Sequence, residues 1–134
     1  MKLLDTDVLI DYWRGIEAVE AYFEATAATE SFVSTTISLK ELAVGRALQG
    51  TLDPAEFDAT FGWLTFLPFR SAHAYEAAAL EADLRSRADV NQDRVNALAA
   101  DVLIAGVARA EGATVVTRND RDFSTFEGVD VEGY

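Results

Sequence analysis

Short apolar runs alternate with segments of helical periodicity along the whole chain, and this alternation limits the possible folds more than any other feature. The apolar runs at 2–5, 31–34, 65–69, 114–117 and 129–132 have the length of buried strands. Helical spacing and capping signals predict helices over 7–13, 16–26, 37–49, 53–64, 71–88 and 97–111, with a polar break at 91–96 and a short turn or helix at 121–125. The pattern predicts an α/β sandwich, with helices on both faces of a mostly parallel sheet of four or five strands.

Capping residues indicate where several of these helices begin. Thr36 or Ser38 could cap the helix over 37–49, because both side chains can accept a bond from a free backbone N–H. Asp53 is followed by Pro54, the arrangement expected of a cap and a first helical position. Ser71 is expected to cap the long helix over 71–88.

The composition is that of one globular domain. A chain of 134 residues, 50% of them hydrophobic, can bury one substantial core, so we expect a single domain over 1–134. The absence of cysteine excludes disulfides and thiolate metal sites and favours an intracellular location. No stretch approaches the ~20 apolar residues of a membrane span, and the N-terminal residues do not show a basic segment followed by the apolar core of a secretory leader, so none is expected. We therefore expect a cytoplasmic protein that does not contact membranes.

The chain is strongly acidic, with a formal net charge of −12 from 23 acidic and 11 basic residues. Such a surface normally repels nucleic acid. It is also found in proteins from a salt-rich cytoplasm, where molar salt reduces the screening length to ~3 Å. Both an ordinary and a salt-rich source stay open, so the charge is only weak evidence against a nucleic-acid substrate.

Most acidic residues are expected on solvated helix surfaces, but four lie at a strand end or in an apolar segment. The first is Asp5, which directly follows the first strand in "MKLLDTDVLIDYW". Ligands of parallel α/β sheets bind beyond the carboxyl ends of the strands, so Asp5 is expected at the ligand edge. Asp5 could instead cap the next helix, but Thr6 or Asp7 could do so equally well. We therefore predict that Asp5 is a metal ligand rather than a capping or solvated acid.

Two further acids lie within apolar helical segments. Glu41 occurs in "TTISLKELAVG", where surface exposure is the alternative to a functional role. Asp101 occurs in "NALAADVLIAGVARA", which is apolar almost all round and so typical of a buried helix. Because residues 98–100 are expected to be helical already, Asp101 is not expected to lie at the N-terminal cap. A buried carboxylate without a partner is costly, which indicates a metal ion or an ion pair.

The fourth acid lies in "VVTRNDRDF", just beyond the fourth predicted strand. This segment offers two candidates, Asp120 and Asp122, and loop acids are usually solvated. Its position after a strand nevertheless places it at the same edge of the sheet as Asp5.

Carboxylates that converge on one edge repel each other unless cations neutralise them. Hard oxygen ligands favour Mg²⁺ or Mn²⁺. A carboxylate site for these ions suits phosphodiester hydrolysis, because a metal can activate water without a nucleophilic side chain. The chain has no cysteine and a single histidine, His73, which we interpret as a packing or surface residue.

The four segments together resemble a known family. "LLDTDVLIDYW", "TISLKELAVG", "AADVLIAGVA" and "VVTRNDRDF" occur in the order and spacing of the PIN-domain ribonucleases, in particular the VapC toxins of VapBC toxin–antitoxin pairs. By this resemblance, an acidic quartet that binds Mg²⁺ or Mn²⁺ is matched by Asp5, Glu41, Asp101 and Asp122. The family pattern favours the acid directly before Phe123, hence Asp122 over Asp120.

The resemblance also implies supporting residues, a substrate and partners. Thr6, Arg118 and Asn119 match the polar positions that accompany the quartet, whereas position 7, often asparagine in the family, is Asp7 here. The implied substrate is RNA, the implied partner is a cognate antitoxin, and a homodimer is expected. An antitoxin arginine could enter the acidic site, and an apolar antitoxin helix could lie between the early helices. The candidate contacts there, Tyr12, Trp13, Tyr22 and Phe23, could equally belong to ordinary core or dimer packing.

Two alternatives stay open. "LLDTDVL" is similar to the strand-end motif of haloacid-dehalogenase-type phosphatases, but Leu9 replaces the usual Thr or Val. Lys40 is the only candidate for the later lysine of that family, and it directly precedes Glu41. The other alternative is a non-catalytic PIN-like interaction domain, which predicts the loss of some quartet acids.

Overall fold

The computed structural model describes residues 1–134 and contains a five-stranded sheet in which every pairing is parallel. The strands are β1 (Lys2–Leu4), β2 (Phe32–Thr35), β3 (Thr65–Leu67), β4 (Thr114–Val116) and β5 (Val131–Glu132), in the order β3-β2-β1-β4-β5. From β1 the chain adds β2 and then β3 on one side of β1, and it then crosses to the other side to add β4 and β5. The order therefore reverses between β1 and β4, where α/β sheets of this kind bind ligands.

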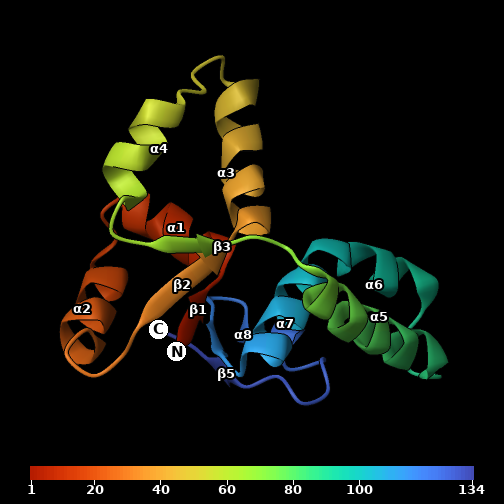
Figure 1. Ribbon diagram of the computed structural model, residues 1–134. Helices are drawn as coiled ribbons and strands as arrows, with labels where there is room; N and C mark the ends of the chain where they lie inside the picture. Colours follow the sequence, from red (N-terminus) through yellow and green to blue (C-terminus); the bar gives the residue numbers. More distant parts are fainter.

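Helices cover both faces of the sheet, as the sequence predicts (Figure 1). They are α1 (Thr6–Trp13), α2 (Glu17–Thr26), α3 (Thr36–Leu48), α4 (Pro54–Phe61), α5 (Ser71–Ser86), α6 (Gln92–Ala97), α7 (Ala99–Glu111) and the short α8 (Asp120–Phe123). Most boundaries lie within two residues of the predicted ones, although α4 ends three residues early, at Phe61. None of the helices is both long and apolar enough to cross a membrane.

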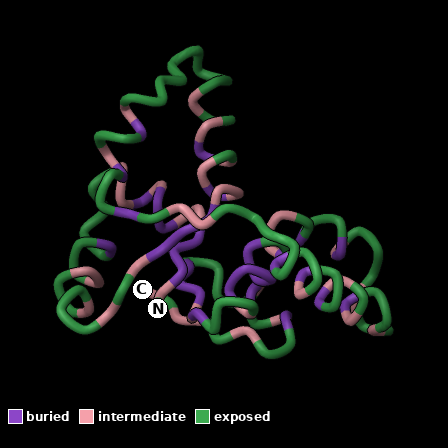
Figure 2. The backbone as a smooth tube through the Cα atoms, in the orientation of Figure 1, coloured by how far each residue is buried: buried purple, intermediate pink, exposed green.

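The core consists of two clusters, one on each side of the sheet. Successive strand residues point to opposite faces, so Leu3 joins the cluster with α5 and α7, whereas Leu4 joins the cluster with α1 and α4. Helix α7 is the most deeply buried helix, and Ile104, Ala105 and Val107 have no exposed surface. Figure 2 shows this burial concentrated in the sheet and α7, while α3 and α4 extend from the body as an arm with exposed outer turns.

One predicted element is wrong. The expected polar break at 91–96 is helix α6, and the expected helix over 97–111 begins only at Ala99, after Leu98 separates α6 from α7. The polar residues start a helix because the Asn91 side chain accepts a hydrogen bond from the backbone N–H of Arg94 at 2.8 Å.

Two predicted caps also differ from the structure. Thr35, rather than Thr36 or Ser38, caps α3, and its hydroxyl accepts from the Ser38 N–H at 3.1 Å. Arg70, rather than Ser71, is the N-cap of α5, and its N–H donates to Nδ1 of His73 at 3.0 Å. His73 was expected to be a packing or a surface residue, and the structure shows that its ring is buried. Asp53 caps α4 as predicted, accepting from the Ala55 N–H at 3.0 Å.

The contact between α5 and α7 depends on Gly106. A Cβ at this position would lie 2.8 Å from the Ala77 Cβ and 2.9 Å from the His73 carbonyl oxygen. Gly106→Ala should therefore lower the free energy of unfolding by about 1–3 kcal/mol, because neither the Ala77 Cβ nor the His73 backbone can swing aside. Urea denaturation of the purified variant measures this effect.

Gly45 provides the matched control, since it also lies inside a helix but a Cβ added there would have no atom within 4 Å. Gly45→Ala should raise the free energy of unfolding by about 0.5–1 kcal/mol through helix propensity alone. Equal stability changes in the two variants would contradict the role assigned to Gly106.

Candidate active site at the carboxyl edge of the sheet

Asp5 lies at the reversal point of the sheet, held between the ends of β1 and β4. Its backbone N–H donates to the Val116 carbonyl at 3.0 Å. Its buried side chain accepts from the Thr6 N–H at 2.7 Å through Oδ1 and from the Thr117 hydroxyl at 2.9 Å through Oδ2. Asp5 is therefore the N-cap of α1, and the prediction that it would not be a capping acid is wrong. The reason is local, because β1 ends at Leu4 and α1 begins at Thr6, which leaves Asp5 as the one residue between strand and helix that can act as the cap.

Thr117 is a site residue that the sequence analysis missed. It is fully buried at the end of β4, and its Oγ1 lies 2.9 Å from Asp5 and 3.3 Å from Asp7. The same oxygen accepts the Asn119 N–H at 2.9 Å. The available signal was its position, a polar residue directly after a predicted strand, which is the argument that identified Asp5.

Glu41 reaches the site from α3, which starts directly after β2 at the same edge of the sheet. The Thr6 hydroxyl lies 2.8 Å from a Glu41 carboxylate oxygen and 3.0 Å from the Ser38 hydroxyl. Glu41 is half-buried rather than surface-exposed. Thr6 thus occupies the supporting position that was expected of it, and Ser38 is a second polar residue that the sequence analysis did not single out.

Asp101 lies in the first turn of α7, not deep within a continuous helix as expected. Its side chain is half-buried, and burial is the main cause that raises its pKa to about 6. The charges of Asp122, Glu41 and Asp7 raise the pKa further, so these carboxylates act on Asp101 through their charge.

Asp122, and not its neighbour Asp120, belongs to this group. The Asp122 carboxylate accepts hydrogen bonds from Arg94 on α6 and from the Asn119 amide, and these bonds lower its pKa. Asp120 is exposed, and its carboxylate makes no hydrogen bond. The structure therefore places Asn119 beside the acids as expected and identifies Arg94 as a contact that the sequence did not indicate.

The carboxylates raise the proton affinity of one another. Burial raises the pKa of Asp5 to about 7, and the charges of Asp7 and Asp101 add to the effect. Burial also raises the pKa of Asp7. Their oxygens are the hard donors that Mg²⁺ or Mn²⁺ prefers, so the donor set fits such an ion. No three acidic or histidine side chains converge closely enough to share one ion, so the donors are gathered at one edge without surrounding a single point.

Arg118 faces α1 rather than the centre of the acidic group. Its Nη1 lies 2.8 Å from both carboxylate oxygens of the buried Asp11, which also accepts from the Tyr134 hydroxyl at 2.5 Å. The Arg118 backbone N–H lies 3.4 Å from Asp7 Oδ1. Arg118 thus borders the site, and the paired Asp11 was not assigned a role from sequence.

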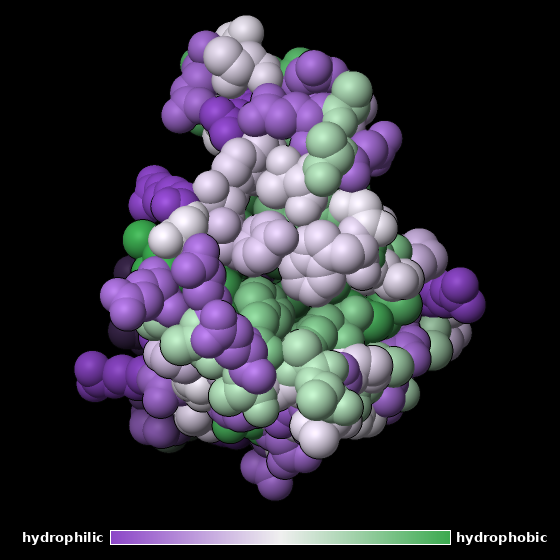
Figure 3. Space-filling view, turned by 90° about the vertical axis from the view of Figure 1, so that its left-hand side faces the viewer, coloured by the Kyte–Doolittle hydropathy of each residue, from purple (hydrophilic) through white to green (hydrophobic).

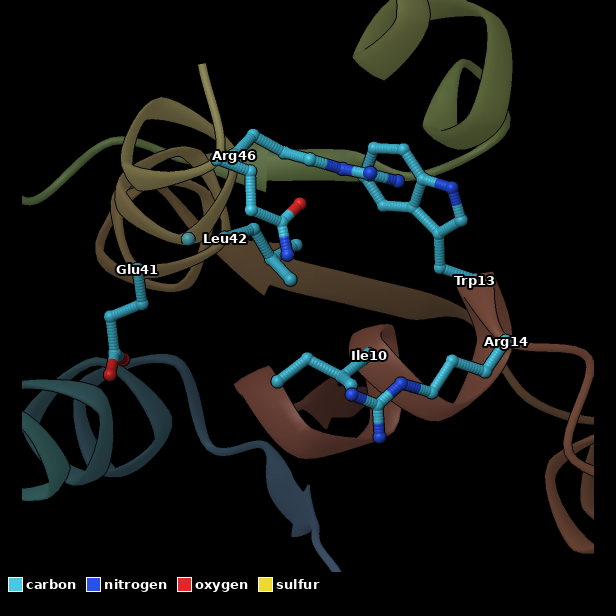
Figure 4. A pocket seen from close by; sticks show the side chains of 8 residues that line it. Ile10, Trp13, Arg14, Glu41, Leu42 and Arg46 are labelled. Atoms are coloured by element: carbon cyan, nitrogen blue, oxygen red, sulfur yellow. The ribbon is translucent and has the colours of Figure 1, made fainter. Parts of the chain in front are cut away.

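A pocket of about 470 Å³ opens from Glu41 and runs between α1 and α3 (Figure 4). Its lining combines apolar residues with two arginines and an amide: Ile10, Trp13, Arg14, Glu41, Leu42, Gly45, Arg46 and Gln49. The Arg46 guanidinium carbon lies 4.3 Å from the centre of the Trp13 ring.

A second, mainly apolar groove of about 590 Å³ lies between α3 and α4 and is lined by Leu39, Ala43, Leu52, Phe57, Phe61 and Phe66, among others. The space-filling view from the α2 side shows apolar side chains gathered in a hollow below the α3–α4 arm (Figure 3). The aromatic residues proposed from sequence as partner contacts, Tyr12, Trp13, Tyr22 and Phe23, are half-buried and stack with neighbouring rings.

The family model of the PIN domain matches residues 2–129. No functionally curated protein matches the chain in sequence. Three solved structures share its fold along nearly the whole chain.

The first, VapBC2 from Rickettsia felis bound to a promoter DNA fragment, has a TM-score of 0.81 and 20% identity over 99% of this chain and 98% of that one. DNA-bound VapBC from Salmonella typhimurium has a TM-score of 0.76 and 25% identity, covering 98% and 96% of the two chains. FitAcB from Neisseria gonorrhoeae has a TM-score of 0.70 and 27% identity with the same coverage.

The raised pKa values predict how pH affects the stability of the metal-free chain. Because the folded pKa of Asp101 exceeds its usual 3.8, its contribution to stability is complete below about pH 4 and is lost as the pH rises through about 6. In EDTA at neutral pH, Asp101→Asn should raise the free energy of unfolding by about 1–2 kcal/mol, allowing for its partial exposure. The gain should shrink toward pH 4, as measured by urea denaturation across that range.

The exposed Asp120 supplies the control, because Asp120→Asn changes the same formal charge outside the acidic group. It should leave the pH dependence of stability unchanged. A gain for Asp120→Asn equal to that of Asp101→Asn would indicate a general charge effect and contradict the local repulsion.

Proposed function

Because the chain belongs to the PIN-domain family, we propose that it is a metal-dependent endoribonuclease that acts as the toxin of a type II toxin–antitoxin pair. The observation that carries the proposal is the group formed by Asp5, Glu41, Asp101 and Asp122. These residues come from four separate segments, yet they gather where the strand order of the parallel sheet reverses. The similarity to VapBC and FitAcB supports the toxin assignment.

The quartet carboxylates, with Asp7 beside them, would hold Mg²⁺ or Mn²⁺. A bound ion would supply activation of the attacking water and neutralisation of charge on the phosphate. Several protein groups keep the carboxylates in place for that task. Thr117 orients Asp5 and Thr6 orients Glu41, while Arg94 and Asn119 hold Asp122.

Other chemistry finds less support in the structure. His73 is buried against Arg70 and Glu111, so it does not reach the acidic edge. The phosphatase alternative required Lys40, which is exposed on α3. The non-catalytic alternative predicted the loss of quartet acids, whereas all four are present and grouped.

The partner proposed here is an antitoxin that covers the acidic edge. The similarity to VapBC and FitAcB, together with the resemblance to the VapC toxins of VapBC pairs, supports this partner. The α3–α4 groove offers a mainly apolar surface for an antitoxin helix, and an antitoxin arginine could pair with the carboxylates. This groove replaces the surface around Tyr22 and Phe23, whose rings are used in packing. A homodimer and a cytoplasmic location stay predictions.

Purified protein should cut RNA in the presence of Mg²⁺ or Mn²⁺ and stop when EDTA is added. Asp122→Asn should reduce the rate at least about 100-fold, since a ligand change at a metal site costs several kcal/mol. Asp120→Asn should retain close to wild-type activity. Cleavage that persists in EDTA, or equal losses in the two variants, would contradict the assignment.

Expression of the protein alone should slow bacterial growth, and coexpression of the product of the neighbouring antitoxin gene should restore it. The Asp101→Asn variant provides the control, because it should be harmless at equal expression. Active nuclease that is harmless without any partner would reject the toxin assignment while leaving the nuclease activity intact.

A further inference from the structure

We propose that the pocket between α1 and α3 binds the RNA strand next to the bond that is cut. This inference rests on the proposed ribonuclease function and adds the path of the substrate. The pocket begins at Glu41 of the acidic group, so a strand lying in it would lead directly to the proposed metal site (Figure 4).

The lining of the pocket carries two arginines against one acid, Glu41, although the protein as a whole is strongly acidic. The chain carries a net charge of −12 and only 11 basic residues, yet two arginines line this one pocket. The Arg14 side chain is exposed and makes no hydrogen bond or ion pair, so its guanidinium is free for a phosphate. Local positive charge is what a phosphodiester chain requires on an otherwise repulsive surface.

The opposite wall offers a stacking surface. The Arg46 guanidinium carbon lies 4.3 Å from the centre of the Trp13 ring, and its Nη2 pairs with Glu56 at 3.3 Å. Unpaired RNA bases stack on aromatic rings and on guanidinium planes, and every base has a face that can do so. Gln49, further along α3, adds donors and an acceptor for base edges.

Gly45 leaves part of the α3 wall of the pocket without a side chain. It lies inside α3, where glycine is unfavourable, and no packing contact explains it, because no atom lies within 4 Å of a Cβ built there. From Glu41 to Gln49 the pocket follows α3 for about 12 Å, given the rise of 1.5 Å per residue. These features favour a single RNA strand over an apolar helix, which the α3–α4 groove suits better.

The test compares variants in an Asp101→Asn background, with a short fluorescent single-stranded RNA of random sequence and a duplex of equal length as probes. Gly45→Leu fills the pocket, and Ala47→Leu adds the same side chain elsewhere on α3. Gly45→Leu should weaken single-strand binding roughly tenfold, while Ala47→Leu should not. Replacing Arg14 and Arg46 by glutamine should also reduce the slope of log affinity against log salt by about 1.4.

A second control concerns the ion pair. Glu56→Gln leaves Arg46 in place and removes a negative charge beside it, so single-strand binding should stay equal or become tighter. Arg46→Gln alone is measured beside it. An equal loss of RNA binding in the two variants would show that Arg46 acts by holding the structure, and this result would overturn the proposal.

The same pocket variants, made with Asp101 intact, separate this inference from the proposed function. Gly45→Leu should raise KM with kcat nearly unchanged, and thermal unfolding should show that it stays folded. If RNA is cut in a metal-dependent way but Gly45→Leu binds and cuts it normally, the pocket assignment fails and the nuclease stands. If Gly45→Leu loses only antitoxin binding, the pocket belongs to the protein partner. If no RNA is bound or cut, both proposals fail together.

Discussion

Repulsion between carboxylates at one edge of the sheet is the constraint on which the rest of the structure depends. Burial raises the pKa values of Asp5, Asp7 and Asp101, and neighbouring negative charge raises those of Asp5 and Asp101 further. A fold that gathers such groups must offset the cost. Two helix N-termini contribute, because Asp5 caps α1 and Asp101 lies in the first turn of α7, where the helix dipole favours negative charge. Hydrogen bonds from Thr6, Thr117 and Arg94 offset a further part of the cost, while the pKa values of Asp5 and Asp101 stay raised.

The two core clusters make this arrangement rigid. Leu3 and Leu4 anchor β1 to opposite faces, so Asp5 follows a strand that is fixed on both sides. The close contact of α5 with α7 at Gly106 fixes the helix that carries Asp101. Like charges can stay together because the elements that present them cannot move apart without disrupting a core.

The sequence predicts the parallel sheet, the positions of most helices and the edge on which the acids meet. Those features depend on local periodicity and on the rule that parallel strands end at a common edge. Prediction from the sequence fails where one residue has two roles, or where a polar residue bonds to a residue that is distant in the sequence. Asp5 both caps α1 and faces the acids, and Asn91 starts a helix in a segment that looks like a loop. Thr117 and Asp11 gain their roles only through neighbours more than 100 residues away. The stack of Arg46 on Trp13 likewise depends on the crossing of α1 and α3, which no local pattern contains.

The central claim is that the acidic edge is a divalent-cation site, and titration of Mn²⁺ followed by electron paramagnetic resonance tests it most directly. The account predicts that the signal of free Mn²⁺ falls on addition of the protein and returns when excess Mg²⁺ competes. A variant carrying both Asp5→Asn and Asp101→Asn should leave the free signal in place, provided that it is folded. A free Mn²⁺ signal that does not change with the wild-type protein, or equal binding by the double variant, would contradict the claim.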